Sequence, residues 1–252
     1  MIEIMRMELV QVVREKSYLF GLLLRSMRYV FLMYLIVRVW HIRNPLGGAY
    51  YLLASGIMLS WTVIFAFGTR TYQEKIQRTL DTIMVSPSPL LRVLIAKNLC
   101  GLICGTLFLL IFLAVARPFV DQAFILFAPW PFAFYLLSCL GIFALSLCVS
   151  LASALNWSLR SFVGSLVPLA YILSGISFPV ELLPQPVHWL AWISPVYWPI
   201  QGLKLSLKES GGATIGHFGL SALSVAWYLI LAVSVVDLLV RRFTRYGEWV
   251  NF

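Results

Sequence analysis

The sequence predicts an all-helical integral membrane protein with six transmembrane helices. Its 252 residues are 61% hydrophobic and only 12% charged, whereas soluble domains are about 45–50% apolar and about 25% charged. Long apolar runs recur along the chain, and each approaches the roughly 20 residues that a helix needs to cross about 30 Å of hydrocarbon. The net charge of +9 comes from basic residues at the ends of these runs, which is typical of a membrane protein and does not indicate nucleic-acid binding. We therefore expect residues 1–252 to form a single transmembrane domain.

The N-terminal segment, residues 1–16, is amphipathic. Its apolar residues share one stripe at helical spacing, and its charged residues face the other way. This pattern predicts an interface helix that lies in the plane of the membrane surface.

The first span is expected at residues 17–40, and it contains Arg25 and Arg28. A charge at mid-membrane costs at least about 2.5–3.5 kcal/mol. These two arginines therefore either extend to the headgroups or face a protein-lined interior on a transport path.

Five further spans are expected, at residues 50–67, 98–116, 132–155, 162–178 and 218–240. A count of Lys and Arg sets their orientation, because cytoplasmic segments carry an excess of both. With the N-terminus inside, twelve basic residues fall in inner segments: Arg6, Arg14, Lys16, Arg70, Lys75, Arg78, Arg92, Lys97, Arg160, Arg241, Arg242 and Arg245. Five fall in outer segments: Arg38, Arg43, Arg117, Lys204 and Lys208. The count places both termini in the cytoplasm.

The segment between the second and third spans has the pattern of an amphipathic helix over residues 70–86. One face carries the apolar residues Tyr72, Ile76, Leu80, Ile83 and Met84. Glu74 precedes Arg78 by four residues, the favourable order for a helical ion pair. The helix should end at Ser86-Pro87, because proline cannot continue it. An apolar stripe outside the membrane either docks on a partner or packs on the protein's own surface or on headgroups.

Residues 178–208 form an unusual segment before the last span. It holds five prolines, together with Trp189, Trp192 and Trp198, and its apolar pieces are too short to span. We expect re-entrant helices entering from the outer face, since such backbone must be covered by protein or line a cavity. An ordinary interfacial loop is the alternative. Glu181 either meets a substrate or caps the turn at Leu182.

Several other residues have two interpretations. Asp237 either pairs with Arg241 one turn later or serves a proton relay. Trp61, Phe65 and Tyr171 could line a substrate path, although aromatic residues that face lipid are commoner. The four cysteines lie inside apolar spans and the three histidines are scattered. We therefore expect neither a disulfide framework nor a metal site.

Two stretches resemble a known family. These are QEKIQRTLDTIMVSPSPLLRVLIAKNL and LSGISFPVELLP…WLAWISPVYWPIQGLK. With the amphipathic N-terminus and six spans, they resemble the permease subunits of type-2 ATP-binding cassette (ABC) exporters. Two positions depart from the family pattern: Ala96 stands where glycine is usual, and Ser194 stands where asparagine is common. The subfamily is therefore open.

The resemblance implies roles for particular residues. The helix at 72–84 would be a coupling helix that docks on an ATPase, with Glu74 as the frequent acid at its start and Ser86-Pro87 as its corner. The outer segment would form a gate at Gly175, Phe178, Pro179, Glu181, Ser194 and Pro195. Arg25, Arg28, Trp61, Phe65 and Tyr171 stay as candidates for the substrate path.

The resemblance also implies partners. The sequence contains no G-x-x-x-x-G-K-[ST] phosphate loop, so we expect no cofactor in this chain and no enzymatic activity of the chain alone. ATP and Mg²⁺ would bind a separate cytoplasmic ATPase subunit, present in two copies. A second permease copy would complete a homodimer or a heterodimer. The complex would export a drug-like, lipidic or glycolipid cargo across the cell (inner) membrane. A secondary transporter or channel and a lipid-modifying membrane enzyme are the alternatives.

Overall fold

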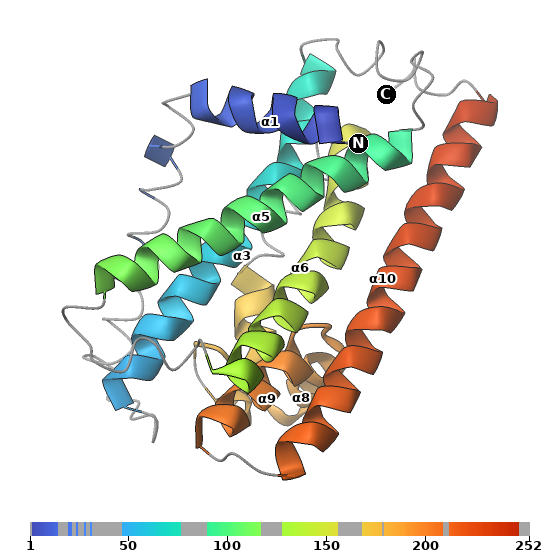
Figure 1. Ribbon diagram of the computed structural model, residues 1–252. Coiled ribbons are helices and arrows are strands. Elements are labelled where there is room, and N and C mark those ends of the chain that lie inside the picture. Colours follow the sequence, from blue (N-terminus) through green and yellow to red (C-terminus); the bar gives the residue numbers. More distant parts are fainter. Residues whose placement is uncertain are drawn as a thin grey trace.

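The computed structural model of the protein describes residues 2–14, 20–21, 24, 28, 31, 47–76, 90–116, 128–155, 168–177, 179–208 and 212–246. The regular elements among these residues are all helices. They are α1 (Ile2–Arg14), α3 (Gly47–Ile76), α5 (Leu90–Ala116), α6 (Pro129–Leu155), the 3₁₀ turn η3 (Val180–Leu182), α8 (Gln185–Ile193), α9 (Tyr197–Lys208) and α10 (Gly212–Tyr246). Residues 168–174 form a further helical stretch. Figure 1 shows α1 lying across one end of the bundle, with α8 and α9 at the other end.

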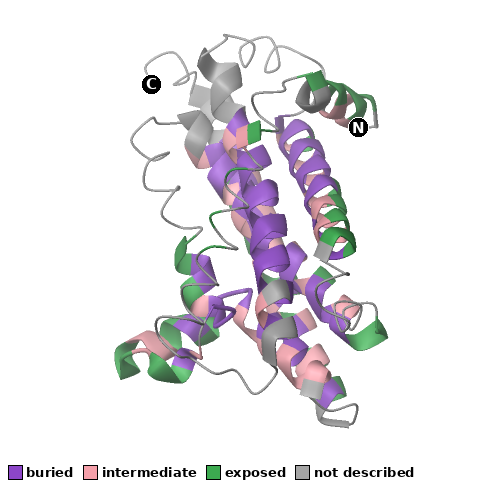
Figure 2. Cartoon of the chain, turned by 90° about the vertical axis from the view of Figure 1, so that its left-hand side faces the viewer, coloured by how far each residue is buried: buried purple, intermediate pink, exposed green. Residues whose placement is uncertain are grey.

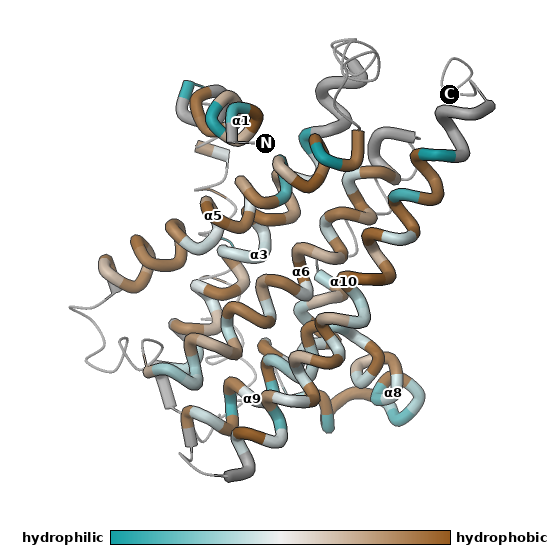
Figure 3. Tube along the Cα trace, turned by 45° about the vertical axis from the view of Figure 1, so that its right-hand side comes forward, coloured by the Kyte–Doolittle hydropathy of each residue, from teal (hydrophilic) through white to brown (hydrophobic). Residues whose placement is uncertain are grey.

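Four helices in the described part of the chain are long and apolar enough to cross a membrane. Their spans are Leu53–Arg70, Leu90–Val115, Pro129–Ala152 and Thr214–Arg241, which match the expected second, third, fourth and sixth spans. The expected first span is described only at residues 20–21, 24, 28 and 31, and the expected fifth span only from residue 168. Figure 3 shows the apolar colouring along α5, α6 and α10, and the alternation of polar and apolar residues in α1.

The core of the bundle is built around α3. The apolar window of α3 is 94% buried, against 61% for α6, 39% for α5 and 22% for α10. Large side chains of α3, such as Ile57, Trp61 and Ile64, are fully buried. Figure 2 shows buried residues along the long helices, while α1, beside the N label, is largely exposed. The second span is therefore enclosed by protein, and among the four candidate spans α5 and α10 carry most of the exposed large apolar side chains.

Glycines bring α3 and α5 into close contact. A Cβ atom added at Gly105 would lie 2.8 Å from the Ser60 carbonyl oxygen, and one at Gly101 would lie 2.8 Å from the Phe67 Cβ. Gly101 and Gly105 form a G-x-x-x-G pair, the spacing that lets two membrane helices pack backbone to backbone. Gly56 allows a similar close contact from the α3 side, because a Cβ atom added there would lie 2.6 Å from Leu109 of α5.

A buried polar cluster joins α5 and α6 to α3. Asn98 donates from Nδ2 to the Ser150 hydroxyl at 2.8 Å and to the Leu94 carbonyl at 2.9 Å. The Ser146 hydroxyl lies 2.5 Å from Asn98 Oδ1 and 3.2 Å from the Ile64 carbonyl of α3. All three polar side chains are fully buried, so these bonds satisfy groups that would otherwise be costly inside a membrane.

Helix α3 continues beyond its apolar span. The sequence predicted a span at 50–67 and a separate helix from residue 70, whereas α3 runs without a break to Ile76. The separate start is therefore wrong. No proline interrupts this stretch, the Thr69 hydroxyl donates to the Ala66 carbonyl at 3.0 Å, and Arg70 is buried with its guanidinium 6.0 Å from the Phe67 ring. Adding turns to an existing helix costs less than nucleating a new one.

The bounds of two other helices also differ from expectation. Helix α6 begins at Pro129, three residues before the start of the expected span at 132–155. Proline is well tolerated in the first turn of a helix, because the N–H groups there have no partner within the helix. Helix α10 runs from Gly212 to Tyr246 and so extends past the apolar run at 218–240 in both directions.

The buried polar cluster should contribute measurably to stability. We expect Asn98→Leu to lower the thermal unfolding temperature of the detergent-purified protein, because interhelical hydrogen bonds in membranes are each worth about 0.6 kcal/mol and at most about 1.7. Ser206→Ala is the matched control, since the Ser206 hydroxyl donates to the Leu203 carbonyl of its own helix α9. Equal unfolding temperatures for the two variants would contradict a role for the cluster.

Candidate functional site

The expected docking helix is described only in part. Tyr72, Glu74 and Ile76 lie in the last turns of α3, and the four-residue spacing of Tyr72 and Ile76 places them on one face of it. The side-chain contacts of these three residues, and all of Leu80, Ile83 and Met84, lie outside the described residues. The docking face thus stays a prediction, of which α3 supplies the first turns.

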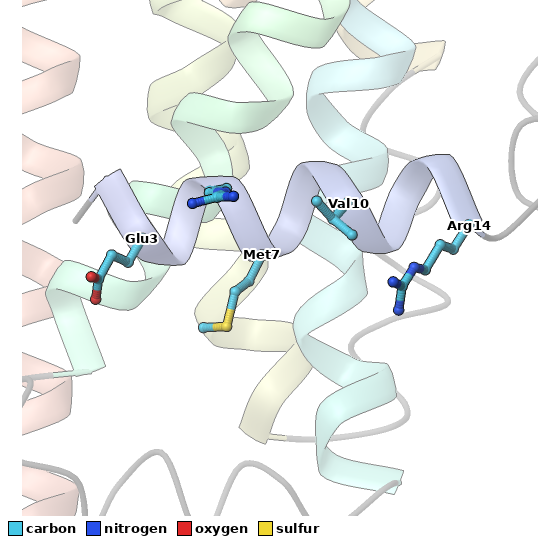
Figure 4. Close-up of a pocket in the computed structure, with 5 residues that line it drawn as sticks. Glu3, Met7, Val10 and Arg14 are labelled. Atoms are coloured by element: carbon cyan, nitrogen blue, oxygen red, sulfur yellow. The ribbon is translucent and has the colours of Figure 1, made fainter.

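Helix α1 has two distinct faces. Met5 and Leu9 pack against a buried cluster of α3 and α5, and the Cys100 thiol lies 3.4 Å from the Met5 carbonyl that accepts its hydrogen bond. The exposed face forms a shallow pocket of about 530 Å³, lined by Glu3, Arg6, Met7, Val10 and Arg14, and Figure 4 shows these side chains along α1. One face of α1 is therefore attached to the bundle, and its position at a membrane surface stays a prediction.

A tight turn at Gly175 follows the helical stretch 168–174. Gly175 has φ of +71°, a conformation that costs other residues about 1–2 kcal/mol. Its N–H donates to the Ile172 carbonyl at 3.1 Å, and the Ser174 hydroxyl accepts from the Ile176 N–H at 3.2 Å. A Cβ atom here would also lie 2.7 Å from Val180, so this predicted gate residue needs to be glycine for two independent reasons.

The next gate residues form a short 3₁₀ turn. Pro179 precedes η3, and the Leu182 and Leu183 N–H groups donate to the Pro179 and Val180 carbonyls at 3.2 and 2.9 Å. These backbone bonds close the turn, and Glu181 is exposed on it. Phe178 lies outside the described residues.

Helix α8 presents an apolar surface to its surroundings. Its exposed large side chains, together with Leu182 of η3, are Trp189, Leu190, Trp192 and Ile193. The Trp198 indole N–H donates to the Trp192 carbonyl at 3.1 Å, and the Tyr228 hydroxyl of α10 donates to the Ile193 carbonyl. The C-terminal end of α8 is therefore fixed to the bundle, while its exposed tryptophans suit the interfacial region that such side chains favour.

The Ser194-Pro195 pair and α9 pack into the end of the bundle. Both residues of the pair are buried, and a Cβ atom at Gly141 of α6 would lie 2.9 Å from the Pro195 carbonyl oxygen. Gly202 of α9 packs directly on the Phe134 ring of α6. The predicted outer segment thus contains two helices of different character, with α8 mostly exposed and α9 buried or half-buried along its described residues.

The aromatic residues proposed for a substrate path belong to the packed core. Trp61 and Tyr171 stack with ring centroids 5.8 Å apart, and Phe65 is 2% exposed. The Tyr171 hydroxyl lies 2.5 Å from the Thr62 hydroxyl and 2.9 Å from the Met58 carbonyl. These side chains therefore tie the helical stretch 168–174 to α3 in the present conformation.

The charged residues considered for a substrate path or a proton relay are Arg25, Arg28 and Asp237. Arg28 is exposed and Arg25 lies outside the described residues. Asp237 forms an ion pair with Arg241 at 2.8 Å, in the i to i+4 arrangement. The expected local pairing of Asp237 is confirmed.

Comparison with known protein families finds a match over most of the chain. Residues 2–207 match the family model described as ABC-2 type transporter. The chain belongs to the ABC-2 type transporter family. The match runs from α1 through α9, and it confirms the resemblance to permease subunits of type-2 ABC transporters. No curated protein matches the chain.

Membership in the ABC-2 family has direct consequences. This permease subunit is a multi-pass membrane protein, and its family works with an ABC ATPase subunit. In the described part of the subunit, no group of three His, Cys, Asp or Glu residues could hold a metal ion.

Sequence reasoning missed several residues that position the site. Gly141 and Gly202 seat the outer segment on α6, and isolated glycines inside helical patterns are a usable signal of such close contacts. Tyr50 and Lys204 donate hydrogen bonds to consecutive carbonyls after the helical stretch 168–174. No local pattern marks these two residues, because each bonds a distant part of the chain.

The Gly175 turn of this ABC-2 subunit is open to a direct test. We expect Gly175→Ala to lower the thermal unfolding temperature clearly, because the new Cβ is strained at this φ and collides with Val180. Gly216→Ala is the matched control, since nothing lies within 4 Å of a Cβ there and alanine favours a helix interior by about 1 kcal/mol. A Gly175→Ala protein as stable as the Gly216→Ala protein would show that the turn tolerates a side chain.

Proposed function

We propose that this ABC-2 subunit is the permease of an exporter driven by a separate cytoplasmic ATPase. The observation that carries the proposal is the family match over residues 2–207, which includes both stretches from which the resemblance was drawn. In this proposal the chain binds no nucleotide and has no enzymatic activity of its own. ATP and Mg²⁺ bind two copies of the ATPase, and the permease pairs with a second permease copy, identical or related.

Coupling would proceed through α3. Its end at Ile76 lies at the start of the proposed docking helix, and its apolar part is the most buried of the candidate spans. A helix enclosed by protein on all sides cannot shift without repacking its neighbours. Force applied at the docking face would therefore act on the whole bundle, which supports a change between two discrete packings.

The proposed topology has six spans with both termini in the cytoplasm of a cell membrane. Support comes from the distribution of Lys and Arg. In this orientation α1 and the Ile76 end of α3 lie at the cytoplasmic face, and η3, α8 and α9 lie at the outer face. Figure 1 agrees with such a separation, since α1 and α8 lie at opposite ends of the long helices.

The proposed cargo is drug-like, lipidic or a glycolipid. Exposed apolar surface on α5 and α10 would let a lipophilic molecule approach from the membrane. Trp61, Phe65 and Tyr171 would contact it only after the helical stretch 168–174 has moved away from α3, because these side chains pack on one another here.

The topology can be tested by labelling from outside. In a background lacking the four native cysteines, a membrane-impermeant maleimide added to intact cells should label Gly211→Cys and leave Lys75→Cys unlabelled. Permeabilised cells, in which both sites should react, provide the control. The reverse labelling pattern would invert the topology.

Binding of the ATPase to the docking face can be tested by single substitutions. Leu80→Asp should abolish most co-purification of the ATPase, because burying a leucine is worth about 1.5–3 kcal/mol and an unpaired charge in its place is strongly unfavourable. Gln77→Asp, which adds the same charge on the polar face, is the matched control and should retain the ATPase. Glu74→Ala should have a mild effect, since an exposed helical ion pair is worth about 0.3–0.5 kcal/mol.

Transport and ATP hydrolysis should fall together with ATPase binding in Leu80→Asp. Membrane insertion of the permease should not change, because the substituted face lies outside the hydrocarbon. Full ATPase binding and export by Leu80→Asp would contradict the proposal that this helix couples the two subunits.

A further inference from the structure

Two side chains from different helices converge on the turn that follows residues 168–174. The Tyr50 hydroxyl, in the first turns of α3, donates to the Ile176 carbonyl at 3.0 Å. The Lys204 ammonium, on α9, donates to the Gly175 carbonyl at 2.5 Å. These carbonyls are consecutive, so a single turn is held from two sides by donors that are distant in sequence.

The two donors also contact each other. Lys204 Nζ lies 5.8 Å from the centroid of the Tyr50 ring, within the range of a cation–π interaction. The Gly175 carbonyl follows directly after the C-terminal end of the helical stretch 168–174, a position near which a cation is favoured by the helix dipole. A hydrogen bond from an ammonium is roughly twice as strong as one between neutral groups. Lys204 is therefore the stronger of the two contacts.

The two helices that supply these donors, α9 and α3, are connected to different parts of the molecule. Helix α9, which carries Lys204, is seated on α6 through Gly202 and Phe134. Helix α3, which carries Tyr50, supplies the first turns of the proposed docking face at its other end, at Tyr72 and Ile76. The turn at Gly175 and Ile176 thus links the element that the ATPase would move to the fixed end of the bundle.

We propose that Tyr50 and Lys204 act as positioning residues that hold the α9 end of the bundle closed, and that both contacts break when the transport path opens there. We call Tyr50, Gly175, Ile176 and Lys204 the Gly175 latch. This inference rests on the proposed exporter function. Lys204 suits a reversible contact because it is only half-buried, so water can solvate the ammonium once the carbonyl has moved away.

The test uses a cysteine placed beside the latch. Ser177 is 5% exposed, and Ser177→Cys is nearly isosteric. The full-length protein in nanodiscs is treated with a hydrophilic maleimide, and the labelling rate is measured above the background of the native cysteines. Since both faces of a nanodisc are accessible, the rate reports opening whatever the orientation of the chain.

In the Ser177→Cys background, the latch variant Tyr50→Phe/Lys204→Met should be labelled at position 177 at least about tenfold faster than the protein with an intact latch. Tyr228→Phe is the matched control, because it removes another tyrosine-to-carbonyl bond, that of α10 to Ile193, away from the latch. It should be labelled at the rate of the intact latch. Lys204→Arg alone, which keeps a cationic donor, should also stay near that rate.

A second reporter separates opening from general loosening of the fold. Val236 on α10 is fully buried and packs with Leu90 and Leu94 of α5, away from α9, so labelling of Val236→Cys should stay slow in the latch variant if only the α9 end opens. Unchanged labelling at position 177 would overturn the latch, and so would equal acceleration at positions 177 and 236. Neither measurement depends on the ATPase or on the cargo, so a failed latch leaves the exporter proposal intact, and a failed ATPase-docking test leaves this measurement valid.

Discussion

The close contact between α3 and α5 is the constraint on which the rest of the structure depends. Gly101 and Gly105 let the α5 backbone approach α3 so closely that carbonyl oxygens of α3 take the place that side chains would otherwise fill. Between membrane helices there is little hydrophobic driving force, so such van der Waals contact and a few hydrogen bonds must hold the bundle together. Asn98 adds the second requirement, because its bonds with Ser146 and Ser150 fix α6 beside the same pair.

Because α3 is held in this way, the bundle has one rigid central element with a different attachment at each end. Toward Ile76 it continues past its apolar span, which ends at Arg70. At Tyr50 it is bonded to the turn that precedes the outer segment. In contrast, α10 is largely exposed and is joined to α8 through a bond from Tyr228. The division into a buried centre and an exposed periphery is what a mechanical permease requires, since signals pass through packed elements that have two arrangements.

The sequence predicted the broad architecture well, because hydropathy reports which segments are apolar. It predicted helix boundaries less well, near residue 70, where α3 continues past its apolar span, and at Pro129, because an apolar run ends at the edge of the hydrocarbon whereas a helix ends where its backbone bonds stop. The Asp237–Arg241 pair was predictable, since both residues lie on one helix. The bond from Lys204 to Gly175 was not, because it joins residues 29 positions apart and depends on how α9 packs. Trp61 and Tyr171 show the same limit, since only tertiary structure decides that they face each other.

The glycine contacts also determine how α3 can move. A slide of α5 along α3 would take Gly101 and Gly105 away from the carbonyls that they now face and bring larger residues of the same face, such as Leu109, toward α3, so sliding is disfavoured. In the proposed coupling, α3 would instead tilt about the place where its Ser60 and Ile64 contact Gly101 and Gly105 of α5, as a lever with this contact as its fulcrum. At 1.5 Å per residue, the arm from Ile64 to Ile76 is about 18 Å long and the arm from Ser60 to Tyr50 about 15 Å. With arms of nearly equal length, a small displacement at the Ile76 end would produce a comparable and opposite displacement at Tyr50. A shift there of about 1 Å would stretch the bond to Ile176 beyond hydrogen-bonding distance.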